Sequence, residues 1–193
     1  LDVRPHSKTN KSPYWVRKQI DAGAIGVCCA KVGEAEVMVE AGVPEVMIPN
    51  QVIGKRKIAR LVALARSARI IVAVESSGNV DDLSSASMAA GAELGVIIEI
   101  NVGMDRCGVD GDGAVELAKQ IDAAPGLRFD GLMGYEGHVV AERDYETRKT
   151  EAERAMTILT GAADQIRGVG IDVKLVSAAG TGTYNITGRV EGI

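Results

Sequence analysis

The fold is decided by the stretch Leu1-Asp-Val-Arg-Pro-His-Ser-Lys8-Thr-Asn-Lys-Ser12. Residues 2–8 are predicted to form a short strand, on which His6 and Lys8 share one face because side chains alternate along a strand. Ser12-Pro13 then predicts the start of a helix, with a capping hydroxyl followed by a proline at the first helical position. A basic residue at the carboxyl end of a parallel strand stands where α/β folds place their chemistry. Lys8 is therefore the first candidate functional residue.

The rest of the chain continues the alternation of strand and helix. Consecutive apolar positions, as in Ile70–Val74 and Val96–Ile98, indicate strands that are buried on both faces. We expect strands at 2–8, 26–30, 45–50, 70–76, 95–101, 128–135 and 173–178, and helices at 13–23, 33–42, 54–68, 79–91, 111–124 and 143–168. This alternation limits the fold to a (β/α)8 barrel or an open doubly wound sheet. Seven strands are one short of closure, so we expect an incomplete TIM-type barrel, with an intact open sheet of seven strands as the alternative.

The composition indicates a globular protein with one core. Hydrophobic residues make up 46% of the 193 residues and charged residues 25%, which suits a single domain of ordinary size. The net charge of −4, without a basic cluster, argues against a nucleic-acid partner but is compatible with small anionic ligands. No apolar run reaches the length of a membrane span. The chain has three cysteines, Cys28, Cys29 and Cys107, and their spacing is not that of metal ligands. An odd number of cysteines fits a reducing cytoplasm.

Polar side chains follow the expected strands at their carboxyl ends. They are Lys8, Gln51, Glu75, Ser76, Ser77, Asn101, Tyr135 and Ser177. Inside a core such groups would be unsatisfied, whereas at the mouth of a barrel they would line a site. An ordinary strand-end cap is the competing interpretation for any one of them, but it explains the whole set less well.

Two loops add candidates for anion binding. In Ala179-Gly-Thr-Gly-Thr-Tyr184, after the last expected strand, glycines let the backbone approach an anion and threonine hydroxyls add donors. Barrels commonly hold a phosphate in this region, although many tight turns have a similar sequence and the full spacing of a nucleotide P-loop is absent. Arg106 lies in the loop after the fifth expected strand. Its guanidinium could bind a phenolate, carboxylate or phosphate, or could simply be solvated.

A lysine in a mostly apolar mouth is costly unless it is used. Desolvation and the neighbouring charge of Arg4 would favour the free amine of Lys8, which is the form that a Schiff base requires. A salt bridge from Lys8 to Glu75 or Glu99 is the structural alternative. Lys11 competes for the same role but falls beyond the expected strand.

His6 and His138 are the only histidines. His138 follows the sixth expected strand, where an exposed imidazole suits proton transfer near neutral pH. For His6 we favour a structural role.

Six motifs, taken in order along essentially the whole chain, resemble the D-threonine aldolase and D-serine dehydratase family. They are Arg4-Pro-His-Ser-Lys8-Thr, Gly26-Val-Cys-Cys-Ala-Lys-Val-Gly-Glu-Ala-Glu36, Ile48-Pro-Asn-Gln51, Gly103-Met-Asp-Arg-Cys-Gly108, Gly131-Leu-Met-Gly-Tyr-Glu-Gly-His138 and Val176-Ser-Ala-Ala-Gly-Thr-Gly-Thr-Tyr184. That family belongs to the alanine-racemase-like, fold type III, pyridoxal-phosphate enzymes. The resemblance implies that residues 1–193 form a pyridoxal-phosphate-binding barrel domain, incomplete at both ends and followed by a smaller β domain.

The resemblance also implies a role for each site residue. Lys8 would hold pyridoxal 5'-phosphate as a Schiff base, Arg106 would contact its phenolic oxygen and Tyr135 would lie against its ring. His138 would be the candidate catalytic base. The cofactor's phosphate would be held by Ser177, Gly180, Thr181, Gly182, Thr183 and Tyr184. The family's metal ligands lie in the C-terminal domain, so a divalent ion (Mn, Mg or Zn) is expected only with that domain. Asn10 departs from the family, which often has histidine there.

The implied function is that of a lyase acting on a small D-β-hydroxy-amino acid. Gly-Tyr-Glu-Gly-His favours the D-threonine aldolase branch, which converts D-threonine to glycine and acetaldehyde. The alternatives are a D-serine dehydratase, which forms pyruvate and ammonia, an amino-acid racemase, and a non-catalytic pyridoxal-phosphate-binding protein of the cofactor-homeostasis kind. Relatives with this fold often dimerise, which makes a homodimer a candidate assembly.

Overall fold

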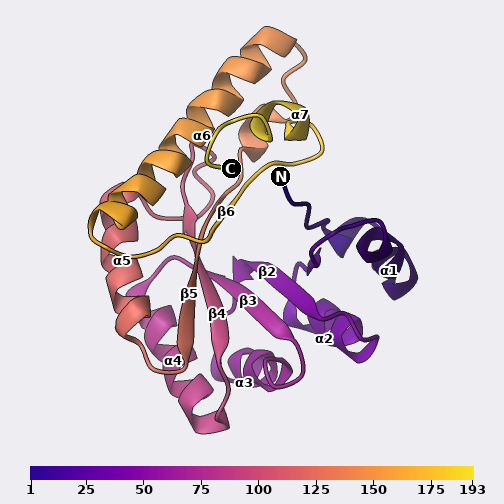
Figure 1. The fold of residues 1–193 in the computed structure, drawn as a ribbon, viewed down its shortest axis with the longest axis vertical. Coiled ribbons are helices and arrows are strands. Elements are labelled where there is room, and N and C mark those ends of the chain that lie inside the picture. Colours follow the sequence, from indigo (N-terminus) through magenta and orange to yellow (C-terminus); the bar gives the residue numbers. More distant parts are fainter. The chain divides into compact units, whose positions relative to one another are not determined.

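The computed structural model describes all 193 residues and consists of two compact units. The N-terminal unit comprises residues 2–96 and 123–128. The C-terminal unit comprises residue 1 and residues 97–122 and 129–193. Strand β4 (Leu94–Ile100; Figure 1) crosses from one unit to the other, because residues 94–96 belong to the first and residues 97–100 to the second.

The N-terminal unit alternates parallel strands with helices. Its strands are β1 (Val27–Cys28), β2 (Glu45–Gln51), β3 (Arg69–Val74) and the start of β4, and its helices are α1 (Pro13–Asp21), α2 (Val32–Glu40), α3 (Lys55–Leu64) and α4 (Ser77–Ala90). Val27 pairs with Val46, and Val46 in turn pairs with Ile70. Five consecutive residues of β3, Ile70–Val74, are buried, as the apolar run predicts for a strand covered on both faces.

The C-terminal unit contains the end of β4 and most of α5 (Gly111–Ala123) and β5 (Leu127–Gly134). It also contains α6 (Tyr145–Gly168), β6 (Leu175–Ser177) and the short α7 (Tyr184–Thr187). Asp144 caps α6, because its carboxylate accepts the N–H of Thr147 at 2.8 Å. Figure 1 shows α7 beside α6, and buried Ile186 of α7 clusters there with Val139 and Ala152.

The order of the strands favours the barrel over the doubly wound sheet. Hydrogen-bonded neighbours follow chain order, β1-β2-β3-β4 in the N-terminal unit and β4-β5-β6 in the C-terminal unit. A doubly wound sheet reverses its order partway, at the switch point where ligands bind, whereas a barrel adds each strand in sequence. No helix of the chain combines the length and the apolar character needed to cross a bilayer.

The structure has six strands where seven were expected, because residues 2–8 form only part of a strand. Val3 and Pro5 accept the N–H groups of Ile25 and Cys28 at 3.0 and 2.8 Å, and His6 forms an isolated parallel bridge to Cys28. Pro5 has no N–H to extend this ladder. The chain then turns into the 3-10 helix η1 (Ser7–Thr9), so the side-chain alternation predicted for residues 2–8 ends at His6.

Candidate functional site

Lys8 lies in a tightly held turn, but its side chain is open to solvent. The imidazole Nδ1 of His6 accepts the N–H of Lys8 at 3.2 Å. The buried hydroxyl of Ser7 donates to the carbonyl of Cys28 at 3.1 Å and contacts the Cys29 sulfur at 3.5 Å. The prediction that Lys8 sits in an apolar mouth is wrong, because Lys8 is exposed. Its backbone is fixed while its amine can be reached.

Arg4 is engaged with an acidic side chain of the sheet. Its side chain is buried and forms an ion pair with Glu45 of β2, which also pairs with Arg69 at 3.3 Å. A carboxylate therefore compensates the charge of Arg4 locally. The turn instead affects His6: burial, followed by the charge of Lys8, lowers the pKa of the imidazole below its ordinary value. Since Nδ1 of His6 caps the turn, the structural role that we favoured for this histidine is consistent with its contacts.

The adjacent cysteines lie beneath this turn as neutral thiols. Burial raises the pKa of Cys28 to about 12 and also raises that of Cys29. Both are free and buried. The structure contains no group of three or more His, Cys, Asp or Glu side chains that could hold a metal ion.

In the C-terminal unit, Arg106 is held between a buried carboxylate and an aromatic ring. Its Nη2 lies 3.4 Å from Oε1 of Glu99, whose side chain is 4% exposed, while 46% of the Arg106 side chain is exposed. The same oxygen accepts the thiol of Cys107 at 3.1 Å. The guanidinium carbon of Arg106 lies 5.7 Å from the centroid of the Tyr135 ring, within the range of a cation–π contact.

Tyr135 is packed between two glycines. A β-carbon at Gly137 would lie 2.5 Å from Cε1 of the ring, and one at Gly180 would lie 2.9 Å from Cε2. Only glycine fits both places without moving the ring. A β-carbon at Gly103 would similarly lie 3.3 Å from Nε2 of His138. The loops that carry Arg106, Tyr135, His138 and Gly180 therefore converge, as their places after β4, β5 and β6 predicted.

The loop that follows β6 is a tight turn in which two backbone N–H groups have no acceptor. The N–H groups of Thr183 and Tyr184 donate to the Gly180 carbonyl at 3.1 and 3.0 Å, and Ala179 has a φ of +76°, a strained value for a non-glycine residue. The N–H groups of Thr181 and Gly182 find no acceptor within the chain. Two neighbouring amides without partners can bind an anion such as a phosphate.

The remaining predicted loop residues lie in different environments. Ser177 ends β6, is half-buried and pairs in register with Met133 of β5, while the Tyr184 ring is largely exposed. Thr183 is buried, and its hydroxyl donates to Oε1 of Glu136 at 2.6 Å. The hydroxyl proton of Thr183 is therefore already donated to Glu136. Thr181, by contrast, has an exposed side chain. Glu136 was missed by the sequence analysis, although its position next to Tyr135 was a signal.

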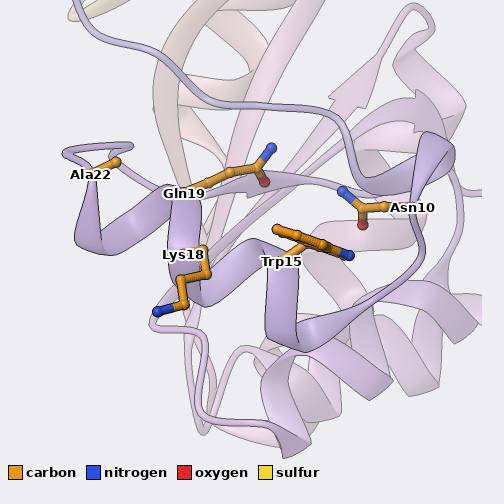
Figure 2. Close-up of a pocket in the computed structure, with 5 residues that line it drawn as sticks. All are labelled: Asn10, Trp15, Lys18, Gln19 and Ala22. Carbon is orange, nitrogen blue, oxygen red and sulfur yellow. The ribbon is translucent and has the colours of Figure 1, made fainter.

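A hollow of about 400 Å³ lies elsewhere, along α1 and the turn before it. It is lined by Asn10, Trp15, Lys18, Gln19 and Ala22 (Figure 2). Asn10 accepts the N–H of Ser12 through its side-chain oxygen at 3.0 Å, which shapes the entrance to α1. None of the site residues predicted from the sequence lines this hollow.

Comparisons with known proteins identify the family of the chain. The chain matches the family described as "Alanine racemase, N-terminal domain" over residues 2–187. A D-threonine aldolase of Arthrobacter sp. is 40% identical over 182 residues, which is 94% of this chain and 48% of the relative. A 3-hydroxy-D-aspartate aldolase of Paracoccus denitrificans (strain Pd 1222) is 38% identical over 184 residues, again 94% of this chain and 48% of the relative.

Among solved structures, the D-threonine aldolase from Filomicrobium marinum is 43% identical, with a TM-score of 0.96 over 97% of this chain and 51% of that chain. The barrel class predicted from the sequence is thereby confirmed. The chain spans about half the length of the relatives that it matches.

Proposed function

The chain belongs to the family of the alanine racemase N-terminal domain, and from this premise we propose that it is the pyridoxal-phosphate-binding part of a lyase that cleaves D-β-hydroxy-amino acids. The observation that carries the proposal is the convergence of Arg106, the clamped Tyr135 ring and a glycine loop with two unpaired amides. A fixed cation, an aromatic surface and phosphate donors are the groups that such a cofactor requires.

The side chains present fit pyridoxal phosphate. The amides of Thr181 and Gly182 would bind its phosphate, and Arg106 would bind its phenolic oxygen. The exposed amine of Lys8 would hold the cofactor covalently, on a turn whose backbone is already ordered by His6 and Ser7. When bound, the cofactor supplies an electron sink for the pair released at the α-carbon of an amino acid.

His138 would act as the base on the substrate side. Its imidazole is exposed at η2 (Gly137–Val139) and packs against Gly103, so it can exchange protons with solvent while its position is held. Removal of the β-hydroxyl proton by His138 lets the Cα–Cβ bond break. The β-carbon leaves as an aldehyde, and the α-carbon then takes up a proton to give glycine.

The proposed substrates follow the relatives. D-Threonine would give glycine and acetaldehyde, and 3-hydroxy-D-aspartate would give glycine and glyoxylate. We place D-threonine first because the aldolases named for it match this chain at 40% and 43% identity. A requirement for a divalent ion is proposed for the whole protein only, and removal of the ion with a chelator tests it.

The test uses the whole protein that contains this chain. After addition of pyridoxal phosphate and reduction with borohydride, peptide mapping should find the label on Lys8. Lys8→Ala should abolish the label. Lys11→Ala is the matched control and should keep it, because Lys11 is ion-paired with Glu34 at 3.2 Å beyond the turn.

The reaction is then tested by offering D-threonine, 3-hydroxy-D-aspartate and D-serine. Acetaldehyde or glyoxylate, formed together with glycine, would support the aldolase. Pyruvate from D-serine alone would identify a dehydratase. A label on another lysine, or no bound cofactor, would contradict the proposal itself.

A further inference from the structure

A buried carboxylate lies beneath the glycine loop. Glu136 is fully buried, and its Oε1 accepts the hydroxyls of Thr183 at 2.6 Å and of Thr187 at 2.7 Å. Its second oxygen, Oε2, is buried and has no hydrogen-bond partner. A buried carboxyl oxygen without a hydrogen-bond partner is costly, so this residue calls for an explanation beyond packing.

The hydrogen bonds continue from Glu136 into the loop. The same Thr183 oxygen that donates to Glu136 accepts the N–H of Gly180 at 3.2 Å. Thr183 also closes the turn through its own N–H, which donates to the Gly180 carbonyl. Glu136 therefore sets the orientation of a hydroxyl that fixes Gly180, and Gly180 in turn lies against the Tyr135 ring. The two unpaired amides, at Thr181 and Gly182, lie in the chain between Gly180 and Thr183, which these hydrogen bonds hold together.

Packing alone does not require a carboxylate at this position. Ile186, in the same short helix as Thr187, is anchored by apolar contact with Val139 and Ala152. An apolar residue at position 136 could fill the space without burying an unpaired oxygen, but it would leave the buried hydroxyls of Thr183 and Thr187 without their acceptor.

We infer that Glu136 is a positioning residue, which holds the loop 179–184 in the conformation that binds the phosphate of the cofactor. This inference rests on the proposed function and adds a residue that acts through Thr183 rather than by touching the ligand. It predicts that Glu136 matters more for the phosphate than for the aldehyde or the ring of the cofactor.

Two variants of the whole protein separate positioning from simple structural support. Glu136→Gln keeps an oxygen that can accept both threonine hydroxyls, whereas Glu136→Leu removes this acceptor, and with it both hydrogen bonds, at similar volume. For Glu136→Leu we expect the dissociation constant of pyridoxal phosphate to rise about tenfold or more, because the variant loses two buried hydrogen bonds and one such bond is worth up to about tenfold. Binding of pyridoxal, which lacks the phosphate, should change by less than about twofold. Glu136→Gln should restore the preference for the phosphorylated form.

A readout that needs no cofactor completes the test. Amide hydrogen exchange of residues 179–188 in the apoprotein should be faster in Glu136→Leu and unchanged in Glu136→Gln, with α6 unaffected in both. Should Glu136→Leu fail to fold, Thr187→Val removes one of the two hydrogen bonds at equal shape and should give a smaller effect of the same kind. Glu191→Gln, an exposed carboxylate of the same unit, is the control.

Equal losses for pyridoxal phosphate and pyridoxal, or an unchanged exchange rate in the loop, would overturn the positioning role. If the wild-type protein bound neither compound, the proposed function would fail instead. The exchange experiment would still decide whether Glu136 orders the loop.

Discussion

Replacing Gly180 by alanine tests whether the Tyr135 ring is held as tightly as its contacts indicate. The new β-carbon would lie 2.9 Å from Cε2 and 3.3 Å from the hydroxyl oxygen of Tyr135. Non-bonded carbons are normally about 3.5–4.0 Å apart, so the ring would have to move by about 0.6 Å or more. Its other edge lies against Gly137, which leaves little room on that side. Overpacking of this kind costs roughly 1–3 kcal/mol of unfolding free energy.

The same substitution at Gly161 is the matched control. Gly161 lies within α6, is exposed, and a β-carbon there would meet nothing within 4 Å. Alanine is favoured over glycine in a helix by about 1 kcal/mol, so Gly161→Ala should stabilise the protein. One methyl group should therefore have opposite effects at the two positions, and the two variants should differ by roughly 2–4 kcal/mol.

Urea denaturation of the two variants and the wild type, followed by circular dichroism, measures this difference. The affinity for pyridoxal phosphate should fall only in Gly180→Ala, because only that change displaces the ring and the loop together. If Gly180→Ala matched the wild type in both stability and affinity, the ring would have room to move. The argument that glycines clamp Tyr135 would then be refuted.

Two further predictions concern protonation in the N-terminal unit. Burial raises the pKa of the Cys28 thiol from 9.0 to about 12. Its contribution to the unfolding free energy is therefore complete below about pH 9 and is lost as the pH rises toward 12. The unfolding free energy of the wild type should fall by up to about 4 kcal/mol more than that of Cys28→Ala across this range, and parallel alkaline denaturation curves would contradict this. His6 has a folded pKa below its ordinary 6.5, so its stabilising effect is present above pH 6.5 and is lost as the pH falls through the folded pKa. An NMR titration should place its midpoint below 6.5, and a midpoint at or above 6.5 would refute the cause that we assign to burial and Lys8.

The regular elements could be predicted because their signals are local. The run at 70–76 predicted β3 (Arg69–Val74) to within two residues, since a strand buried on both faces requires consecutive apolar side chains. The prediction of a strand at residues 2–8 was wrong for an equally local reason. Pro5 cannot donate to a ladder, and Ser7 bonds the carbonyl of Cys28 through its side chain, so the chain leaves the sheet before Lys8.

The sequence indicated candidate residues for the site but not the contacts that support them. Strand ends and glycine loops mark positions such as Tyr135 and Gly180 directly in the sequence. Glu136 was missed because its partners, Thr183 and Thr187, lie 47 and 51 residues away, and only the fold brings them together. The exposure of Lys8 was missed for a different reason, since the expected burial depended on a strand that ends at His6.

Arg106 has more fixed surroundings than a solvated loop arginine would have. A solvated loop arginine would have no fixed direction, whereas this one is paired with the buried Glu99 and lies over the Tyr135 ring. A guanidinium carries five N–H donors, and the contact with Glu99 occupies only one edge of the group. Half of the side chain remains exposed, so donors are available to an anionic oxygen without any loss of the existing contacts. A cation whose direction is set before the ligand arrives loses little conformational entropy on binding, which would favour the proposed contact of Arg106 with a phenolic oxygen.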